Sequence, residues 1–168
     1  PDAPAPAVAE LTIGMMLTLL RSVHVSNSQM HSGDWYRFFG RRLSEVVIGI
    51  IGVGRIGQGV LEHLKGFGNP KILVNDVLIK DNVTDKFDIE WTSKEELYKR
   101  ADIVSLHLPL TSETKDMIRK KHLLSMKSDA IIINTSRGGI VNEKDLYDVM
   151  QSGHLSGAAI DVFNEEPY

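Results

Sequence analysis

Short apolar runs rich in β-branched residues alternate with helix-like segments along most of the chain. The runs predict five buried strands, at residues 46–51, 72–74, 103–108, 131–135 and 158–162. The segments between them predict helices at residues 56–66, 94–100, 122–126 and 143–151. Near-continuous apolarity is typical of parallel strands that are covered on both faces. We therefore expect a doubly wound α/β fold, with a parallel sheet between two layers of helices.

Two of these helices also have boundary signals. Ser93 and Glu96 have the spacing of a capping box. Asn142 can cap the last helix, and Gly153 fits its C-terminal end.

The first 43 residues follow a different pattern. Good helix formers continue over residues 7–29 and predict one long helix, whose apolar residues cover more than one face. Such a helix needs contacts on two sides, so we expect a second domain or a second copy of the chain to cover it. Residues 31–43 are mixed in character and predict a loop. We assign residues 1–43 to a hinge or dimer segment and residues 44–168 to the α/β domain.

Composition narrows the possible functions. The chain has 168 residues, of which 42% are hydrophobic and 24% charged, as expected for a single core. Its net charge of -3 provides no basic excess, so we expect no nucleic-acid partner. There is no cysteine, which excludes disulfides and thiolate metal sites and fits a cytoplasmic location. The histidine spacing indicates no metal site.

Neither a membrane helix nor a secretory signal is predicted. The most apolar stretch, residues 11–20, reaches only half of the roughly 20 residues that a membrane helix needs. The first residue is Pro1 rather than methionine, and no basic start of a secretory signal follows. We therefore expect a piece of a longer protein.

A Gly-x-Gly-x-x-Gly pattern, Gly52-Val53-Gly54-Arg55-Ile56-Gly57, follows the first predicted strand and leads directly into a helix. The pattern alone is weak, but this context is what dinucleotide binding requires. Gly52 can make the tight turn, Gly54 lets the backbone approach a pyrophosphate, and Gly57 allows close packing of helix on strand. The helix N-terminus favours phosphate. Residues 44–168 therefore have the pattern of a Rossmann-type dinucleotide-binding domain.

Asp76 lies at the end of the second predicted strand, near the spacing of about 20 residues expected for a ribose-binding acid. Its carboxylate can accept hydrogen bonds from both ribose hydroxyls and would repel a 2′-phosphate. Val77 follows it, where an arginine would favour that phosphate. We therefore expect NAD rather than NADP. Asp81 and Asp85 could compete for the ribose, but both lie past the expected strand end.

Four ordered segments are more distinctive. They are VVIGIIGVGRIG at residues 46–57, DIVSLHLPLT at 102–111, NTSRGGIV at 134–141 and AIDVFNEEP at 159–167. Together they resemble the D-isomer-specific 2-hydroxyacid dehydrogenases, the family of D-3-phosphoglycerate, glycerate and D-lactate dehydrogenases. The resemblance covers essentially the whole chain. It implies hydride transfer between NAD and a D-2-hydroxy acid or 2-oxo acid.

On the cofactor side, the resemblance implies that Arg55 and Ile56 present backbone groups to the pyrophosphate and that Asp76 binds the ribose. His107 and Pro109 match the family's adenosine-side motif. We therefore interpret His107 as pocket lining rather than as a general acid.

On the nicotinamide side, Thr135, Ser136 and Arg137 match the family's turn beside the nicotinamide, and Asp161 matches the acid that binds the carboxamide. Arg137 also matches the catalytic arginine. Glu166 matches the glutamate that orients the family's catalytic histidine. A planar guanidinium can hold a substrate carboxylate in a bidentate pair while it polarises the adjacent carbonyl.

The same residues also have simpler interpretations. Arg137 could be a surface cation, although its turn follows the carboxyl end of a strand, where doubly wound sheets bind ligands. Asp161 and Glu166 could be solvated acids. Glu165 is an equally good carboxylate by chemistry, and only the family pattern selects Glu166.

The family's catalytic histidine and its substrate-binding domain have no counterpart in this sequence. We therefore expect this piece to bind NAD(H) without turning over a 2-oxo acid, and to form a homodimer through its opening helix. Two other functions stay open: an NAD(H)-sensing, corepressor-like regulator, and a relative of formate or phosphite dehydrogenase. Adenosylhomocysteine hydrolase fits Arg137 and the Glu166-Pro167 motif poorly.

Overall fold

Six parallel strands form the central sheet of the computed structural model, which describes residues 4–167. The strands are β1 (Val47–Ile51), β2 (Lys71–Asn75), β3 (Glu90–Trp91), β4 (Ile103–Leu106), β5 (Ile131–Asn134) and β6 (Gly157–Ile160). Their order across the sheet is β3-β2-β1-β4-β5-β6, and every neighbouring pair is parallel. The two halves of the sheet diverge between β1 and β4. This order confirms the doubly wound fold.

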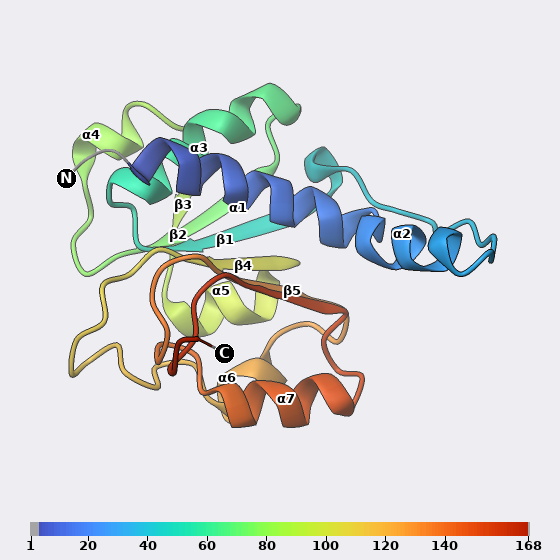
Figure 1. The fold of residues 1–168 in the computed structure, drawn as a ribbon. Coiled ribbons are helices and arrows are strands. Elements are labelled where there is room, and N and C mark those ends of the chain that lie inside the picture. Colours follow the sequence, from blue (N-terminus) through green and yellow to red (C-terminus); the bar gives the residue numbers. More distant parts are fainter. Residues whose placement is uncertain (1–3, 168) are drawn as a thin grey trace.

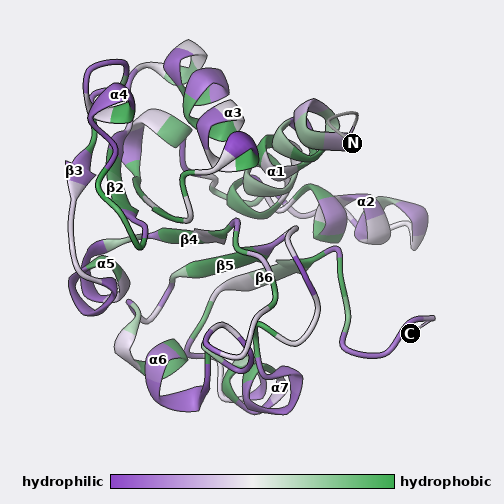
Figure 2. Cartoon of the chain, turned by 90° about the vertical axis from the view of Figure 1, so that its left-hand side faces the viewer, coloured by the Kyte–Doolittle hydropathy of each residue, from purple (hydrophilic) through white to green (hydrophobic). Residues whose placement is uncertain are grey.

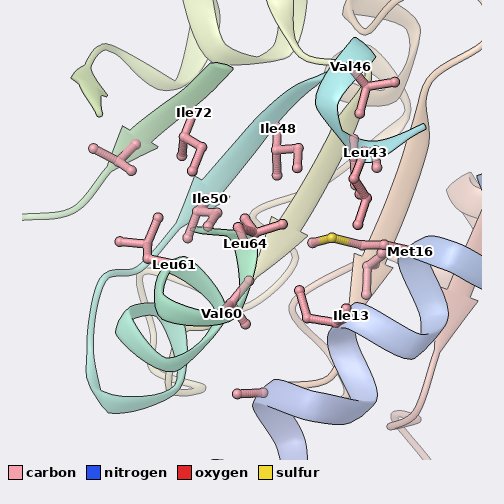
Figure 3. Packing of buried hydrophobic residues seen from close by; sticks show 14 of the residues in the cluster. Ile13, Met16, Leu43, Val46, Ile48, Ile50, Val60, Leu61, Leu64 and Ile72 are labelled. Carbon is pink, nitrogen blue, oxygen red and sulfur yellow. The ribbon is translucent and has the colours of Figure 1, made fainter. Parts of the chain in front are cut away.

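Helices cover both faces of the sheet (Figure 1). One layer contains α1 (Pro4–Leu20) and α3 (Arg55–Leu64), and the other contains α5 (Lys94–Arg100), α6 (Lys120–Ser125) and α7 (Glu143–Gln151). Each layer encloses its own apolar cluster against the sheet. In the first cluster, Met16, Val60 and Ile50 come from α1, α3 and β1 (Figure 3). The hydrophobic strands lie inside and the hydrophilic helix faces outside (Figure 2).

The edge strand β3 was not expected from the sequence. It consists of Glu90 and Trp91 alone, which pair with Leu73 and Val74 of β2. Both residues of β3 are only partly buried. A strand this short has no apolar run or alternation, so the hydrophobic pattern could not reveal it.

Three strands end earlier than expected, and one of them is the strand expected at residues 131–135, which corresponds to β5 and stops at Asn134. The expected strands 103–108 and 158–162 correspond to β4 and β6, which stop at Leu106 and Ile160. Both of these residues pair with Asn134, the last residue of β5. The three strands therefore end level with one another. His107, Thr135 and Asp161 are the first residues beyond this common edge.

The expected long N-terminal helix is confirmed, but it ends at Leu20 instead of continuing as a single helix over residues 7–29. The chain forms α1 and then α2 (Val23–His31), whose axes differ by 63°. Ser22, between them, has the left-handed φ of 52°, and the amide of Arg41 donates to the carbonyl of Leu20 (3.2 Å). Leu20 is buried, whereas no α2 side chain is buried in the part of the chain that the structure describes. Apolar packing therefore stops at Leu20, and α2 projects beyond the domain (Figure 1).

The expected boundary signals of α5 and α7 are confirmed. The side chain of Ser93 accepts a hydrogen bond from the amide of Glu96 (3.2 Å), at the start of α5. The side chain of Asn142 accepts from the amide of Asp145 (3.0 Å), at the start of α7. Gly153 has a left-handed φ of 72° just after α7. Shorter elements complete the fold: η1 (Leu43–Glu45), η2 (Lys65–Phe67) and α4 (Asp81–Thr84).

Within residues 4–167, no single helix has the length and apolarity to cross a membrane. Among the described helices, the bent pair of α1 and α2 together is the only one that reaches that length and composition.

Candidate functional site

The glycine loop makes its turn directly after β1. Gly52 has a φ of 96°, a conformation that residues with a side chain rarely adopt. Its amide donates to the carbonyl of Asn75 at the end of β2 (2.8 Å). A Cβ at this position would overlap the carbonyl of His107. The loop therefore lies against the ends of both strands that flank β1.

The other two glycines control the space at the N-terminus of α3. A Cβ on Gly57 would overlap the carbonyl of Gly52, so the missing side chain lets the helix approach the loop. By contrast, a Cβ on Gly54 would meet no protein atom within 4 Å. Gly54 is the N-cap of α3 and has an ordinary negative φ of -76°. Open room therefore lies in front of the first-turn N–H groups, which have no acceptors within the helix itself.

A cleft of about 380 Å³ occupies this region. It is lined by Pro4, Ala5, Val8, Gly54, Arg55, Ile56, His107, Leu108, Pro109, Thr135, Ser136 and Arg137. The lining comes from the carboxyl ends of β1, β4 and β5 and from the start of α1. The structure thus brings together eight of the expected site residues: Gly54, Arg55, Ile56, His107, Pro109, Thr135, Ser136 and Arg137.

Four of the expected cofactor-binding residues do not line the cleft. Gly52 and Gly57 are both buried. Gly52 makes the turn of the loop, and Gly57 lets α3 approach it. Asp76 lies beside the loop at the end of β2, as described below. Asp161 is exposed just after β6, and its amide donates to the carbonyl of Asn134 (3.0 Å).

Asp76 is tied to the glycine loop. Its Oδ2 accepts hydrogen bonds from the amide of Val53 (2.9 Å) and from Nζ of Lys80 (2.7 Å). Its Oδ1 accepts from the amide of Val77 (2.7 Å). Burial raises the pKa of the Asp76 carboxyl, but the hydrogen bonds from Lys80 and Val53 outweigh it and the net pKa is lowered. The side chain is therefore ionised at neutral pH.

Asn134 holds the turn that carries Thr135, Ser136 and Arg137. Its Oδ1 accepts from the amide of Ser136 (3.1 Å) and from the Ser136 hydroxyl (2.7 Å). Its Nδ2 donates to the carbonyl of Arg137 (3.0 Å). Asn134 is only 2% exposed, so these bonds form away from water. The side chain fixes the direction in which the chain leaves β5.

Arg137 lies between two cavities. It lines the cleft described above and a second cavity of about 440 Å³, which is also lined by Glu166. Arg137 is exposed, and one guanidinium N–H donates to the carbonyl of Ser136 (2.6 Å). Oε1 of Glu166 accepts from the amide of Phe163 (2.9 Å), which holds the carboxylate close to its own segment. The two residues therefore border one space.

His107 is almost fully buried, and burial lowers the pKa of its imidazole to about 4. Nε2 lies 2.9 Å from the hydroxyl of Ser105, and Nδ1 has no hydrogen-bond partner among the described residues. The ring is uncharged at neutral pH. An uncharged, buried ring agrees with the expectation that His107 lines the pocket rather than acting as a general acid.

Three residues of this region were missed from the sequence: Asn134, Lys80 and Thr12. Asn134 stands two residues before Ser136, the spacing of an Asx turn, so a local signal was present. Lys80 follows Asp76 by four residues, but outside a helix this spacing predicts no contact. Thr12 contacts Thr135, more than a hundred residues away, and no local signal could reveal that pair.

Comparisons with known proteins give a consistent result. The sequence profile described as "D-isomer specific 2-hydroxyacid dehydrogenase, NAD binding domain" matches residues 13–168. The chain is 41% identical over 170 residues to D-3-phosphoglycerate dehydrogenase from Methanocaldococcus jannaschii, covering 99% of this chain and 32% of that protein. It is 38% identical to glyoxylate reductase from Thermococcus litoralis, covering 96% of this chain and 51% of that protein. The chain thus spans about a third to a half of the length of these curated relatives.

A solved structure agrees in fold. D-lactate dehydrogenase from Aquifex aeolicus, complexed with NAD and lactic acid, superposes with a TM-score of 0.91 at 35% identity. The match covers 99% of this chain and 50% of that chain. The expected cofactor, NAD, agrees with the family description and with this complex. By its sequence profile, its relatives and its fold, this chain belongs to the D-isomer-specific 2-hydroxyacid dehydrogenase family and comprises the NAD-binding domain.

Proposed function

We propose that this chain is the cofactor domain of an NAD-dependent dehydrogenase that interconverts a D-2-hydroxy acid and a 2-oxo acid. One observation carries the proposal. The cleft at the switch point between β1 and β4 is lined by the glycine loop on one side and the Thr135–Arg137 turn on the other. Open α/β sheets bind their ligands in this position. This lining supports binding of the cofactor next to Arg137.

The residues of the cleft fit a dinucleotide. Room for a pyrophosphate lies where a Cβ on Gly54 would point, in front of the α3 N-terminus. Asp76 is ionised and lies beside the loop for the ribose, and Asp161 follows β6 for the carboxamide. Nicotinamide supplies the hydride chemistry when it is bound, and the protein supplies position and charge.

We assign substrate binding to the space that Arg137 shares with Glu166. The guanidinium can hold a substrate carboxylate in a bidentate pair and polarise the adjacent carbonyl. We assign to Glu166 the orientation of a proton-donating group, whose N–H its carboxylate would accept, a role that a carboxylate fills beside histidine. Both side chains border the same cavity, which supports a shared role.

Titration of the chain with NADH, followed by NADH fluorescence, tests cofactor binding. The matched variants are Gly54→Ala and Gly66→Ala. A Cβ meets no protein atom within 4 Å at either glycine, and neither has a positive φ, so both variants should fold as the parent chain does. We expect Gly54→Ala to weaken NADH binding at least tenfold, and Gly66→Ala, outside the cleft, to bind as the parent chain does. Equal binding by both variants would contradict the placement of the pyrophosphate.

A parallel assay follows NADH oxidation with several 2-oxo acids. Because the chain covers only part of its relatives, we expect binding without efficient turnover here, and turnover when the chain is joined to a family substrate domain. Efficient turnover by this chain alone would contradict the proposal that turnover also needs a substrate domain.

We further propose that residues 1–43 form a hinge and dimer segment, and that residues 44–168 form the dinucleotide-binding domain. The first segment presents exposed apolar side chains on and after α2: Val23, Met30, Trp35, Tyr36 and Phe39. Phe39 is 98% exposed and Trp35 is 75% exposed. Rings this exposed are typical of surfaces that a partner covers. Sedimentation equilibrium should therefore give a homodimer, and replacing Trp35 and Phe39 by serine should give monomers.

A cytoplasmic location is also proposed, because a chain without cysteine has no need of an oxidising compartment. Cell fractionation of the source organism with an antibody to the chain tests it.

A further inference from the structure

Asp76, the proposed ribose-binding acid beside the glycine loop, forms an ion pair with Lys80. Nζ of Lys80 lies 2.7 Å from Oδ2 of Asp76 and 3.1 Å from the carbonyl oxygen of Val53. The side chain of Asp76 is 11% exposed and that of Lys80 is 31% exposed. The ion pair is therefore largely shielded from water. Its charges are screened less than those of a pair on an open surface. A fixed positive charge lies at the position that distinguishes NAD from NADP.

The backbone of Lys80 is held in place by the short helix that follows it. The amides of Val83 and Thr84 donate to the carbonyl of Lys80 (3.0 and 3.1 Å). Val83 is fully buried in the cluster between the sheet and the α1–α3 layer. Lys80 therefore differs from a mobile surface lysine, because its stem starts from a packed position and its head bridges two parts of the site.

The hydrogen bonds of Asp76 leave little capacity for a ribose. An ionised carboxylate has about four acceptor positions. Three are used, by the amides of Val53 and Val77 and by the ammonium of Lys80. A ribose diol needs two acceptors. With Lys80 in place, Asp76 can accept from one hydroxyl only, and the second requires Lys80 to move away.

The ammonium of Lys80 can donate a hydrogen bond to the cofactor. It has three N–H groups. Two donate to Asp76 and to the carbonyl of Val53, which leaves the third for a ligand as far as the described residues are concerned. A 2′-phosphate would accept that hydrogen bond and would gain from the positive charge. Lys80 thus offsets the repulsion that Asp76 alone would exert on this phosphate.

We propose that Lys80 determines the cofactor selectivity of this domain, so that the cleft accepts NADP(H) as well as NAD(H). The proposal rests on the proposed role of Asp76 at the ribose. It departs from the expectation, drawn from Asp76 and Val77, that a 2′-phosphate is rejected. Lys80 limits the hydrogen bonds from the ribose hydroxyls to Asp76, which favour NAD. It also supplies a hydrogen bond and a positive charge to a 2′-phosphate, which favour NADP.

The test compares the dissociation constants of NADH and NADPH, measured by fluorescence titration of the 168-residue chain. For the parent chain we expect the two constants to lie within about tenfold of each other. Lys80→Met keeps an unbranched stem and removes the charge. It should weaken NADPH binding about tenfold or more, while NADH binding changes less than about threefold or becomes tighter. Lys80→Arg keeps the charge and should preserve the parent ratio.

Two controls separate the effect of the Lys80 charge on selectivity from the effect of removing any positive charge from the chain. Lys86→Met removes a positive charge that pairs with Glu62 (3.1 Å) rather than with Asp76, and it should leave the ratio unchanged. Added salt should weaken NADPH binding more than NADH binding in the parent chain, and this difference should shrink in Lys80→Met. NADH binding by each variant also shows that the variant is folded.

The outcomes distinguish the two proposals. If neither dinucleotide binds the parent chain, both the proposed function and the role of Lys80 are overturned. If NADH binds and NADPH does not, or if the ratio in Lys80→Met stays within about twofold of the parent value, the proposed function stands and the role of Lys80 is overturned.

Discussion

The hydroxyl oxygens of Thr12 and Thr135 lie 3.0 Å apart in the interior, although the two residues are 123 positions apart in the sequence. Thr12 uses its only proton to donate to the carbonyl of Val8 (2.8 Å), so Thr135 is the donor of the pair. This bond connects α1 to the first residue after β5, two residues before Arg137. The opening helix therefore supports the turn that borders the cleft.

Thr12→Val should destabilise the chain by about 1–3 kcal/mol, because the hydroxyl of Thr135 would stay buried without its acceptor while the volume is kept. Urea unfolding measures this loss. Thr12→Ser keeps the hydroxyl and should lose clearly less. If Thr12→Val is as stable as the parent chain, the bond contributes nothing to the fold.

Gly57→Ala should lower both stability and NADH affinity. Its Cβ would overlap the carbonyl of Gly52, so α3 has to move away from the loop, at a cost of about 1–3 kcal/mol. Gly54→Ala is the contrasting variant, since it should lose NADH affinity and keep its unfolding free energy. Thermal unfolding and NADH titration of both variants check this difference. Equal stability of the two variants would argue against close packing at Gly57.

Asn134→Ala should destabilise the chain by about 2–3 kcal/mol, because it removes three hydrogen bonds and leaves the buried amide of Ser136 without an acceptor. NADH affinity should fall as well, since Arg137 is no longer held at its carbonyl. Ser136→Ala removes only one of the bonds and serves as the control. Urea unfolding of the two variants should rank them in this order, and the reverse order would contradict the role given to Asn134.

His107 should make the chain less stable as the pH falls from about 6.5 to about 4. The imidazole has a pKa of about 4 when buried in the fold and an ordinary value near 6.5 when unfolded, so the unfolded chain binds the extra proton within this window. The loss approaches about 3 kcal/mol at the acid end. Above pH 6.5 the contribution is constant.

The measurement for His107 is the unfolding free energy at several pH values, for the parent chain and for His107→Gln. Other groups titrate in the same range, so the difference between the two curves isolates His107. That difference should change between pH 6.5 and 4 and be flat above. A difference that is flat throughout would show that the ring is not held in its neutral form by the fold.

The sequence alone determined the elements that depend on neighbouring residues. Five strands, the glycine loop and the caps at Ser93 and Asn142 were all expected, because hydrophobic periodicity, backbone conformation and capping act within a few residues. The family could also be predicted from the sequence, because its motifs are continuous segments. The expected residues at the cleft followed from these motifs and from the rule that parallel strands end at one edge of the sheet.

The features that depend on contacts between distant residues became visible in the folded chain alone. The bend at Ser22 follows from where the packing of α1 ends, and the two residues of β3 become a strand only by pairing with β2. Lys80 reaches Asp76 because buried Val83, whose amide donates to the carbonyl of Lys80, holds the backbone of Lys80 in place. Thr12 meets Thr135 because α1 packs beside the end of β5. A hydroxyl or an ammonium can bond to many partners, and the sequence does not say which one the fold brings within 3 Å.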